Sequence, residues 1–411
     1  MATAASLVVL VVVLGLVAWG RVPDVLVGVP AALAVLAFGL VDLDAVGNTF
    51  DRLGPTLAFL AAIFVFAEVA RDAGIFDATG AVLAARSGTT RRLVVAVSAA
   101  AVAVTVLMSL DATAVLFTPV VIQVVRTRRV PGDPPLLATV QLANASSSLL
   151  PVSNLTNLLV FSTTGLTFGG FALRMLLPTA AAVLVVVVVI ARRTEQAPLP
   201  PAPDGAPAAR LDRFGWFVLG ALGVLIVAFF AGSEAGIDPA WIAGAGAVVV
   251  GVAALARGRA RPLPLLQATA PQFLLFVLAL AVVVDAAVRH GLGDLARDLI
   301  PHGAGLPALL AMTGLAALLA NLLNNLPATL VLTSVIPGGA TATLLAMLIG
   351  VNVGPNLTYT GSLATLLWRR VVRGAGVEPG RGAFFRFALL TTPAALVASA
   401  FALWATLQVV G

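Results

Sequence analysis

Long apolar segments without a charged residue follow one another along the chain, and they limit what it can fold into. Residues 6–19, 214–232 and 239–256 are three of them. A helix that crosses a membrane needs about 20 mainly apolar residues. Charged residues make up 10% of the chain, whereas a soluble domain carries about 25%. The sequence therefore predicts an all-α polytopic membrane protein with about ten transmembrane helices, and it excludes a water-soluble enzyme.

Arginine clusters between the apolar segments predict the orientation of the chain. They lie at 86–92, 126–129, 257–261 and 369–381. Cytoplasmic loops of membrane proteins are enriched in basic residues, so we expect these clusters in the cytoplasm and both termini outside. The same rule explains the high pI without a nucleic-acid partner. Because the first charge, Arg21, follows the first apolar segment, that segment is predicted to be a retained span of a bacterial inner-membrane protein and not a signal peptide.

A proline-rich stretch divides the chain into two nearly equal halves. Residues 192–212 contain five prolines and are predicted to form an extended, solvated cytoplasmic linker. In each half, one apolar segment is interrupted at its middle and has both ends on the same side, which predicts a re-entrant hairpin. A broken helix follows each hairpin. The predicted units are a first repeat at 1–191, with a hairpin at about 93–125 and a broken helix at about 135–165, and a second repeat at 213–411, with a hairpin at about 304–336 and a broken helix at about 341–368.

Two constant offsets support an internal repeat. An offset of 208 places Asn144 on Asn352 without a gap in the surrounding segment. Upstream, an offset of 217 pairs Glu68 with Asp285, Gly74 with Gly291 and Asp77 with Asp294. Since each half holds five predicted spans, an odd number, the two copies must be inverted in the membrane. Inverted repeats with discontinuous helices are typical of secondary transporters.

Four groups of small polar residues interrupt the hairpins and broken helices at the expected depth of the bilayer centre. A helix broken in lipid frees backbone groups that need partners, and half-helix N-termini favour anionic or polar ligands. Isolated polar residues often only hold membrane helices together, but four groups in corresponding places favour a binding site. The predicted substrate- and ion-binding residues are Ser109, Asp111, Thr113, Asn144, Ser148, Ser153, Asn154, Asn157, Asn324, Asn325, Thr329, Asn352, Asn356, Thr358, Thr360 and Ser362.

Asp111 is the predicted coupling residue. A carboxylate at the bilayer centre costs about 2.5–3.5 kcal/mol on insertion scales, so we expect a proton, a cation or a distant partner to neutralise it. The alternative is that Asp111 caps the second half of the hairpin, from Ala112 onward. Glu68 and Asp285 each have an arginine on the next helical turn, which favours ion pairs at helix ends.

Three motifs resemble a known family. Residues 153–157 read SNLTN, residues 324–329 read NNLPAT, and residues 354–368 read GPNLTYTGSLATLLW. They resemble the arsenical pump membrane protein family, the arsenite and antimonite efflux permeases of the ion transporter superfamily. The Asn-Asn-x-Pro tip matches the family closely, whereas at the first tip only the carboxylate of Asp111 matches. The resemblance runs from Phe50 to Phe401.

The resemblance implies efflux of arsenite or antimonite by an elevator mechanism, driven by protons, with a cytoplasmic ATPase as a partner in some members. Arsenite is an uncharged trihydroxide at neutral pH, which a site of Asn, Ser and Thr without arginine suits. Because the chain has no cysteine, capture would use hydrogen bonds and not As–S bonds.

The alternatives are a sodium-coupled anion or dicarboxylate symporter and a sodium/proton antiporter. An intramembrane enzyme is disfavoured because only one aspartate is expected at depth, and a channel because it needs no mirrored hairpins. No cofactor is predicted, and no metal site, since the two histidines are isolated. The oligomeric state stays open, with a homodimer as one candidate.

Overall fold

The computed structural model describes residues 2–19, 21–199 and 210–410. Within these ranges the regular structure is helical apart from one isolated bridge, and nine helices are long and apolar enough to cross a membrane. Three of the nine are hairpin arms, and several further crossings use shorter or broken helices. The prediction of an all-α, polytopic membrane protein is confirmed.

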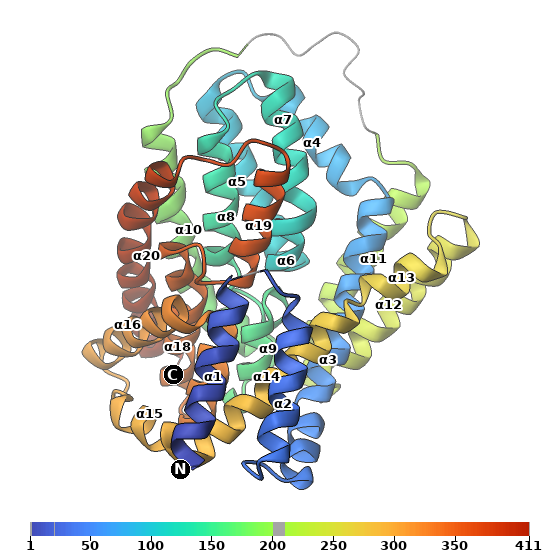
Figure 1. Cartoon of the computed structure of the whole chain (residues 1–411). Coiled ribbons are helices and arrows are strands. Elements are labelled where there is room, and N and C mark those ends of the chain that lie inside the picture. Colours follow the sequence, from blue (N-terminus) through green and yellow to red (C-terminus); the bar gives the residue numbers. More distant parts are fainter. Residues whose placement is uncertain (1, 20, 200–209, 411) are drawn as a thin grey trace.

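The first half consists of three helices, a short connecting helix, a hairpin, a broken helix and a long final helix (Figure 1). The elements are α1 (Ala2–Trp19), α2 (Asp24–Ala37), α3 (Leu43–Asp72), α4 (Ile75–Arg86), the hairpin α5 (Thr90–Leu107), α6 (Leu110–Ala112), η1 (Thr113–Phe117) and α7 (Thr118–Arg128), the broken helix α8 (Asp133–Ser146), η2 (Pro151–Ser153) and α9 (Leu155–Thr164), and α10 (Phe168–Arg193).

The second half repeats this order. Its elements are α11 (Arg213–Glu234), α12 (Pro239–Ala256), α13 (Pro262–Ala268), α14 (Pro271–Ala287), η3 (Val288–Leu292), α15 (Gly293–Leu299), the hairpin α16 (Leu306–Leu323) and α17 (Asn325–Val335), the broken helix α18 (Thr341–Val353), η4 (Gly354–Leu357) and α19 (Leu363–Gly374), and α20 (Arg381–Val410).

The halves pack with pseudo-twofold symmetry. Helix α3 packs on α12 while its counterpart α14 packs on α2, and α5 packs on α8 as α16 packs on α18. The last helices of the two halves, α10 and α20, lie along each other. The hairpins, the broken helices, α10 and α20 are here called the hairpin body, and α1–α3 with α11–α14 are called the frame. The predicted inverted repeats, each with a re-entrant hairpin and a discontinuous helix, are confirmed.

The offset of 217 also marks equivalent backbone. Gly74 and Gly291 have positive φ angles of 76° and 113°, which glycine adopts without the steric cost of a side chain. Gly74 caps the start of α4 after α3, and Gly291 lies in η3 between α14 and the short helix α15. Just before them, Arg71 pairs with Glu68, and the Arg289 Nε lies 2.7 Å from the Asp285 Oδ2. The predicted ion pairs at helix ends are confirmed.

The start of the predicted linker does not extend freely into solvent. Helix α10 continues to Arg193, and Pro198 forms an antiparallel bridge with Thr89 at the base of the first hairpin. The Arg91 Nε also donates to the carbonyl of Thr194 at 3.3 Å. The predicted linker bound is therefore wrong at Arg192 and Arg193, which are helical. Residues 195–198 are exposed and not helical, but they are held against the hairpin base by backbone bonds. Residues 200–209 lie outside the described residues.

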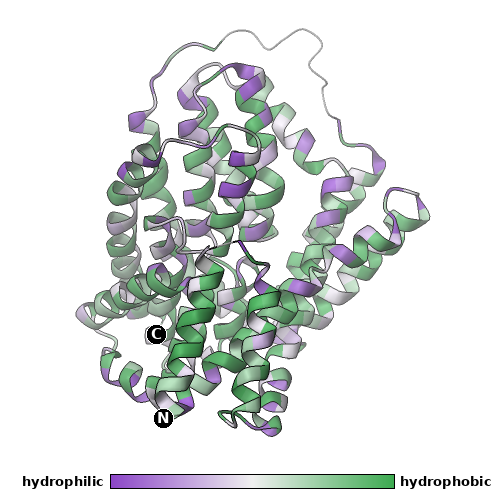
Figure 2. Ribbon diagram, in the orientation of Figure 1, coloured by the Kyte–Doolittle hydropathy of each residue, from purple (hydrophilic) through white to green (hydrophobic). Residues whose placement is uncertain are grey.

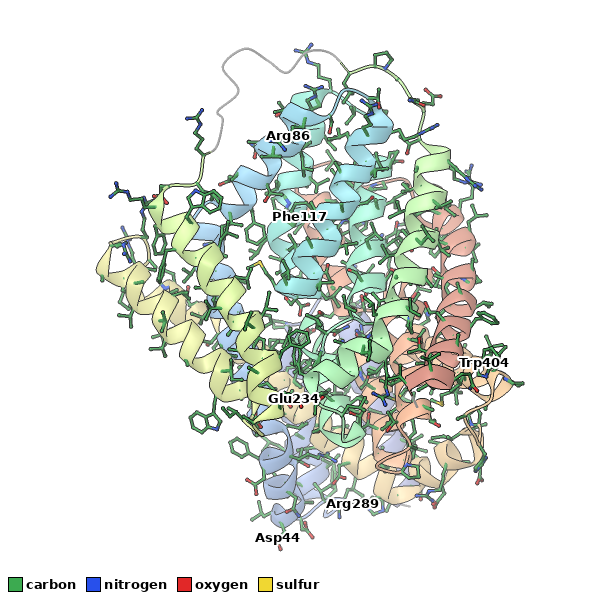
Figure 3. All side chains as sticks on the ribbon, turned by 180° about the vertical axis from the view of Figure 1, so that it is seen from behind. Asp44, Arg86, Phe117, Glu234, Arg289 and Trp404 are labelled. Carbon is green, nitrogen blue, oxygen red and sulfur yellow. The ribbon has the colours of Figure 1, made fainter. Side chains whose placement is uncertain are left out.

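Polar and apolar surfaces are separated along the molecule. Hydrophilic residues gather at the end that carries the linker, while the flanks are apolar (Figure 2). Figure 3 places Arg86 at the linker end and Asp44 and Arg289 at the opposite end. Exposed apolar side chains such as Trp241, 78% exposed, and Val224, 70% exposed, lie on the frame. Such a surface is suited to lipid and not to water.

Candidate functional site

Four half-helix N-termini meet near the middle of the hairpin body, and a side chain caps each of them. Since a helix N-terminus leaves backbone N–H groups without partners, a polar residue at the break stabilises the start of the next helix. The capping bonds run from Ala112 N to Ser109 Oγ (3.0 Å), from Thr156 N to Asn154 Oδ1 (3.2 Å), from Leu326 N to Asn324 Oδ1 (3.4 Å), and from Thr365 N to Ser362 Oγ (3.1 Å).

Asp111 is not the cap of its half-helix. Ser109 takes that position, and Asp111 lies in the first turn after it. There the positive end of the helix dipole favours a negative charge. Among the described residues, none donates a hydrogen bond to the Asp111 carboxylate or forms an ion pair with it. The alternative in which Asp111 serves as a cap is therefore wrong, and its carboxylate is available to a ligand.

The four N-termini open onto one small cavity, here called the central cavity. It holds about 80 Å³ of space open to water-sized molecules. Its described lining contains two carboxylates and several amides and hydroxyls, but no basic residue. Apolar side chains of the frame, such as Leu14 and Phe276, close its other side. The polar lining residues are Asp24, Asp111, Asn154, Thr156, Asn324, Asn325 and Thr360.

Behind this cavity, two asparagines related by the offset of 208 hold the repeats together. Asn144 Nδ2 donates to Asn356 Oδ1 at 2.9 Å and to Thr365 Oγ1 at 3.1 Å. In the mirrored arrangement, Asn352 Nδ2 donates to Ser148 Oγ at 3.2 Å and to Asn157 Oδ1 at 2.7 Å. The acceptors are themselves related by 208, since Ser148 corresponds to Asn356 and Asn157 to Thr365. The repeat is thus preserved as a set of hydrogen bonds.

The two asparagine carbonyls differ. Asn352 Oδ1 accepts from Asn154 Nδ2 at 3.0 Å and from Thr156 Oγ1 at 2.6 Å. Asn144 Oδ1 is buried without a hydrogen-bond partner among the described residues. The positions that correspond to Asn154 and Thr156 hold Ser362 and Ala364. The Ser362 hydroxyl pairs with Thr365 Oγ1 at 2.9 Å, and the alanine side chain has no donor. The Nδ2 groups of the two asparagines therefore donate to equivalent partners, whereas only the Oδ1 of Asn352 accepts hydrogen bonds within the described residues.

The predicted site residues separate into two groups. Asp111, Asn154, Asn324, Asn325 and Thr360 line the central cavity. The others are turned into the protein. Ser109 and Ser362 are caps; Asn144, Ser148, Asn157, Asn352 and Asn356 form the inner network; Thr113 pairs with Thr105 (2.7 Å), Ser153 donates to the Val106 carbonyl (3.0 Å), Thr329 donates to the Asn325 carbonyl (2.7 Å), and Thr358 donates to Asn321 Oδ1 (2.8 Å).

Sequence reasoning did not single out three residues of this region. Gln141 Nε2 donates to the Asn356 carbonyl at 3.0 Å, and Asn356 Nδ2 donates back to the Gln141 carbonyl at 3.0 Å. The signal that could have identified Gln141 is a second amide side chain in an apolar segment, three residues before Asn144. Asn321 binds the Gly354 carbonyl at 2.8 Å and lies three residues before the second tip. The third is Asp24, at the junction of two spans, where charged residues are common and give no clear signal.

Three further cavities adjoin the central one. The first, about 480 Å³, shares Asp24 and Phe273 with it and has no other charged residue in its described lining. The other two add further charged residues. The side cavity, about 330 Å³, is lined by Asp24, Glu68 and Asp111 among mostly apolar residues. The arginine cavity, about 310 Å³, is lined by Asp24 and by the α19 arginines Arg369, Arg370 and Arg373. The central, side and arginine cavities share Asp24 and Leu363, so they form one connected region between the frame and the hairpin body.

Glu378, in the loop between α19 and α20, orders part of this arginine group. It accepts from Arg369 Nε at 2.6 Å and from Arg373 Nε at 2.7 Å. Partial burial acts to raise the pKa of Glu378, but the hydrogen bonds and charges of the two arginines outweigh it and hold that pKa below its ordinary value. Arg370 has no ion pair within the described part of the chain and is exposed.

Comparisons with known proteins agree with this architecture. A family model described as citrate transporter matches residues 14–354. An arsenical pump membrane protein of Escherichia coli is 29% identical over 88% of each chain. A silicon efflux transporter of Oryza sativa subsp. japonica is 30% identical over 38% of this chain and 31% of its own. The solved structure of the Alcanivorax borkumensis YdaH transporter has a TM-score of 0.58 and 17% identity over 90% of both chains, which shows a shared fold.

Proposed function

The chain belongs to the citrate transporter family and is related to the arsenical pump membrane proteins, and from this premise we propose that it exports arsenite and antimonite. Family membership makes it a multi-pass membrane transporter and points away from an enzyme. The cargo is the uncharged trihydroxide of either element. It leaves the cytoplasm through the region that the central, side and arginine cavities form.

The charge of the central cavity carries this proposal. Citrate and other carboxylate anions need cationic or strongly donating partners, but the described lining holds two carboxylates and no arginine. An uncharged trihydroxide both donates and accepts hydrogen bonds, which the amides of Asn324 and Asn325 and the hydroxyl of Thr360 can match. The small volume of the cavity, about 80 Å³, also favours a compact cargo. Among the relatives, the names of the arsenical pump and of the silicon efflux transporter both refer to elements that form neutral hydroxides.

We place the two repeats at residues 1–191 and 213–411, with 192–212 and the arginine clusters in the cytoplasm and both termini outside. The predicted site residues lie on the hairpin body, whose first hairpin lies toward the linker end and whose α9, α16 and α18 lie level with α1 and α2 (Figure 1). An elevator movement of this body along the frame would expose the site alternately to the two sides. When each of two inverted repeats adopts the conformation of the other, the site opens to the other side of the membrane, so an inverted-repeat fold is suited to such a movement.

Asp111 carries the driving proton in this mechanism. Its carboxylate lines the central cavity and has no protein partner within the described residues. In Asp111→Asn the shape is kept but the proton site is lost, and no capping bond changes because Ser109 is the cap. We expect the variant to exchange antimonite down its gradient but not to accumulate it against one. Full proton-driven accumulation would refute this role.

Everted vesicles test the cargo. Uptake of arsenite, antimonite, succinate and citrate is measured under separate proton and sodium gradients. Proton-driven uptake of arsenite and antimonite alone supports the proposal. Sodium-driven uptake of succinate or citrate would establish the symporter instead, and sodium movement without any of these solutes would establish an antiporter. A cytoplasmic ATPase partner stays a prediction of the resemblance, and a homodimer stays one candidate for the oligomeric state.

A further inference from the structure

Asp24 is a second carboxylate in the proposed transport region, on the side opposite Asp111. It is the first residue of α2 and is partly exposed. The adjoining ends of α1 and α2 lie at the level of α6, halfway along the molecule (Figure 1). Asp24 therefore belongs to the frame, whereas Asp111 belongs to the hairpin body. Both line the central cavity and the side cavity.

The charge of the lining reverses at Asp24. The arginine cavity contributes Arg369, Arg370 and Arg373, whereas the central cavity contributes only Asp24 and Asp111 as charged residues in its described lining. Asp24 is the one charged residue that the arginine cavity and the central cavity have in common. A solute that passes between them therefore moves from guanidinium groups to carboxylates.

Charged linings concentrate ions of opposite sign. Arg370 is exposed and forms no ion pair within the described residues, although its charge acts on Asp24. The three guanidinium groups of the arginine cavity attract oxyanions such as phosphate and arsenate. These have the oxygen-rich shape of the proposed cargo but carry negative charge. An opening that excludes them needs a negative group beyond the arginines, and Asp24 has that position.

We infer that Asp24 is a specificity-determining residue that keeps oxyanions out of the central cavity and lets the uncharged trihydroxide pass. This inference rests on the proposed function, because it takes the neutral trihydroxide as cargo. Asp111 is not suited to the task. In the proposed mechanism it binds a proton, and the protonated carboxyl repels no anion.

The experiment compares the full-length protein and its variants in proteoliposomes at neutral pH. Uptake of antimonite and of arsenate is measured in parallel for wild type, Asp24→Asn and Asp24→Glu. Asp44→Asn is the matched control, since Asp44 is exposed at the end of the molecule that faces away from the linker (Figure 3). Size-exclusion chromatography confirms that each variant is folded. The readout is the ratio of arsenate to antimonite uptake, which does not depend on the amount of active protein.

We expect the ratio to rise at least about tenfold in Asp24→Asn, because juxtaposed like charges are strongly disfavoured. Asp24→Glu, which keeps the charge, and Asp44→Asn should keep the wild-type ratio. An unchanged ratio in Asp24→Asn, or an equal rise in Asp24→Glu, overturns the inference. If wild type transports no antimonite, the proposed function fails. The role of Asp24 is then tested by arsenate alone: uptake by Asp24→Asn above that of wild type supports it, and equal uptake overturns it.

Discussion

The two central asparagines should differ in their contribution to stability, although the repeat makes them equivalent. Asn352 takes part in four hydrogen bonds with side chains of the other repeat. Asn144 takes part in two, and its carbonyl oxygen is buried without a partner among the described residues. The perturbation is the pair of single variants Asn352→Ala and Asn144→Ala.

The magnitudes follow from these contacts. A side-chain hydrogen bond between membrane helices contributes roughly 0.6 kcal/mol on average, and a buried polar group left without its partner costs about 1–3 kcal/mol. We therefore expect Asn352→Ala to lower the free energy of unfolding by about 2–4 kcal/mol. Asn144→Ala should lower it by about 0–1 kcal/mol, because the variant also removes a buried oxygen without a partner.

Unfolding in mixed micelles by titration with dodecyl sulfate, followed by tryptophan fluorescence, measures the difference; the chain has five tryptophans. Ser399→Ala is the control. It removes one buried bond, from Ser399 Oγ to the Pro178 carbonyl at 2.8 Å, and should cost roughly 0.6 kcal/mol. Equal losses for the two asparagine variants would refute the reasoning. So would an Asn352→Ala loss no larger than that of the control.

Three further predictions follow from the site, the loop and the topology. Asn325→Ala should abolish antimonite transport without changing the thermal unfolding temperature, because its side-chain amide lines the cavity without a bond to any described side chain; transport at the wild-type rate would contradict this. Because the folded-state pKa of Glu378 is lowered, its contribution is complete above the unfolded pKa, at about pH 4.3, and is lost as pH falls through the folded pKa. Thermal unfolding of Glu378→Gln should therefore show a weaker acid-induced decrease than wild type, and identical pH profiles would contradict the pairing. A cysteine at Ala202, outside the described residues, should react with an impermeant maleimide only when the cytoplasmic face is exposed, whereas one at Asp44 should react in intact cells; the opposite pattern would invert the topology.

The repeat could be predicted from sequence because its key residues keep their identity. Asn144 and Asn352 are both asparagine, and their acceptors lie at the same offset. Amide side chains in lipid need partners wherever the helix breaks, so equivalent breaks keep equivalent bonds. The difference between the two carbonyls could not be predicted, because it depends on which donors of the opposite repeat reach them.

The direction in which each polar side chain points was harder to predict. Sequence places a residue at a given depth, but it does not say whether the side chain turns toward the cavity or toward the neighbouring helix. Asn154 illustrates this, since it lines the cavity, caps α9 and donates to Asn352. Asn154→Ala should therefore lose stability together with transport.

The helix start in the first hairpin is a similar case. Ser109 and Asp111 are both good capping residues and lie two positions apart, so local preference does not decide between them. The tip geometry selects Ser109. Asp24 could not be assigned from sequence, because its inferred function depends on the position of the frame relative to the hairpin body.

The two repeats share their backbone and their amide network, but they differ in charge. With the caps aligned, Ser109 corresponds to Asn324, and Asp111 therefore corresponds to Leu326. Both carboxylates of the central cavity, Asp24 and Asp111, come from the first repeat. In the proposed mechanism one site serves both sides of the membrane, so a single coupling carboxylate that travels with the cargo is sufficient. A second one at Leu326 would place another charge in the same small cavity, and its proton would have to be bound and released in every cycle. The asymmetry of charge is therefore what a symmetric fold needs in order to couple one proton site to one cargo site.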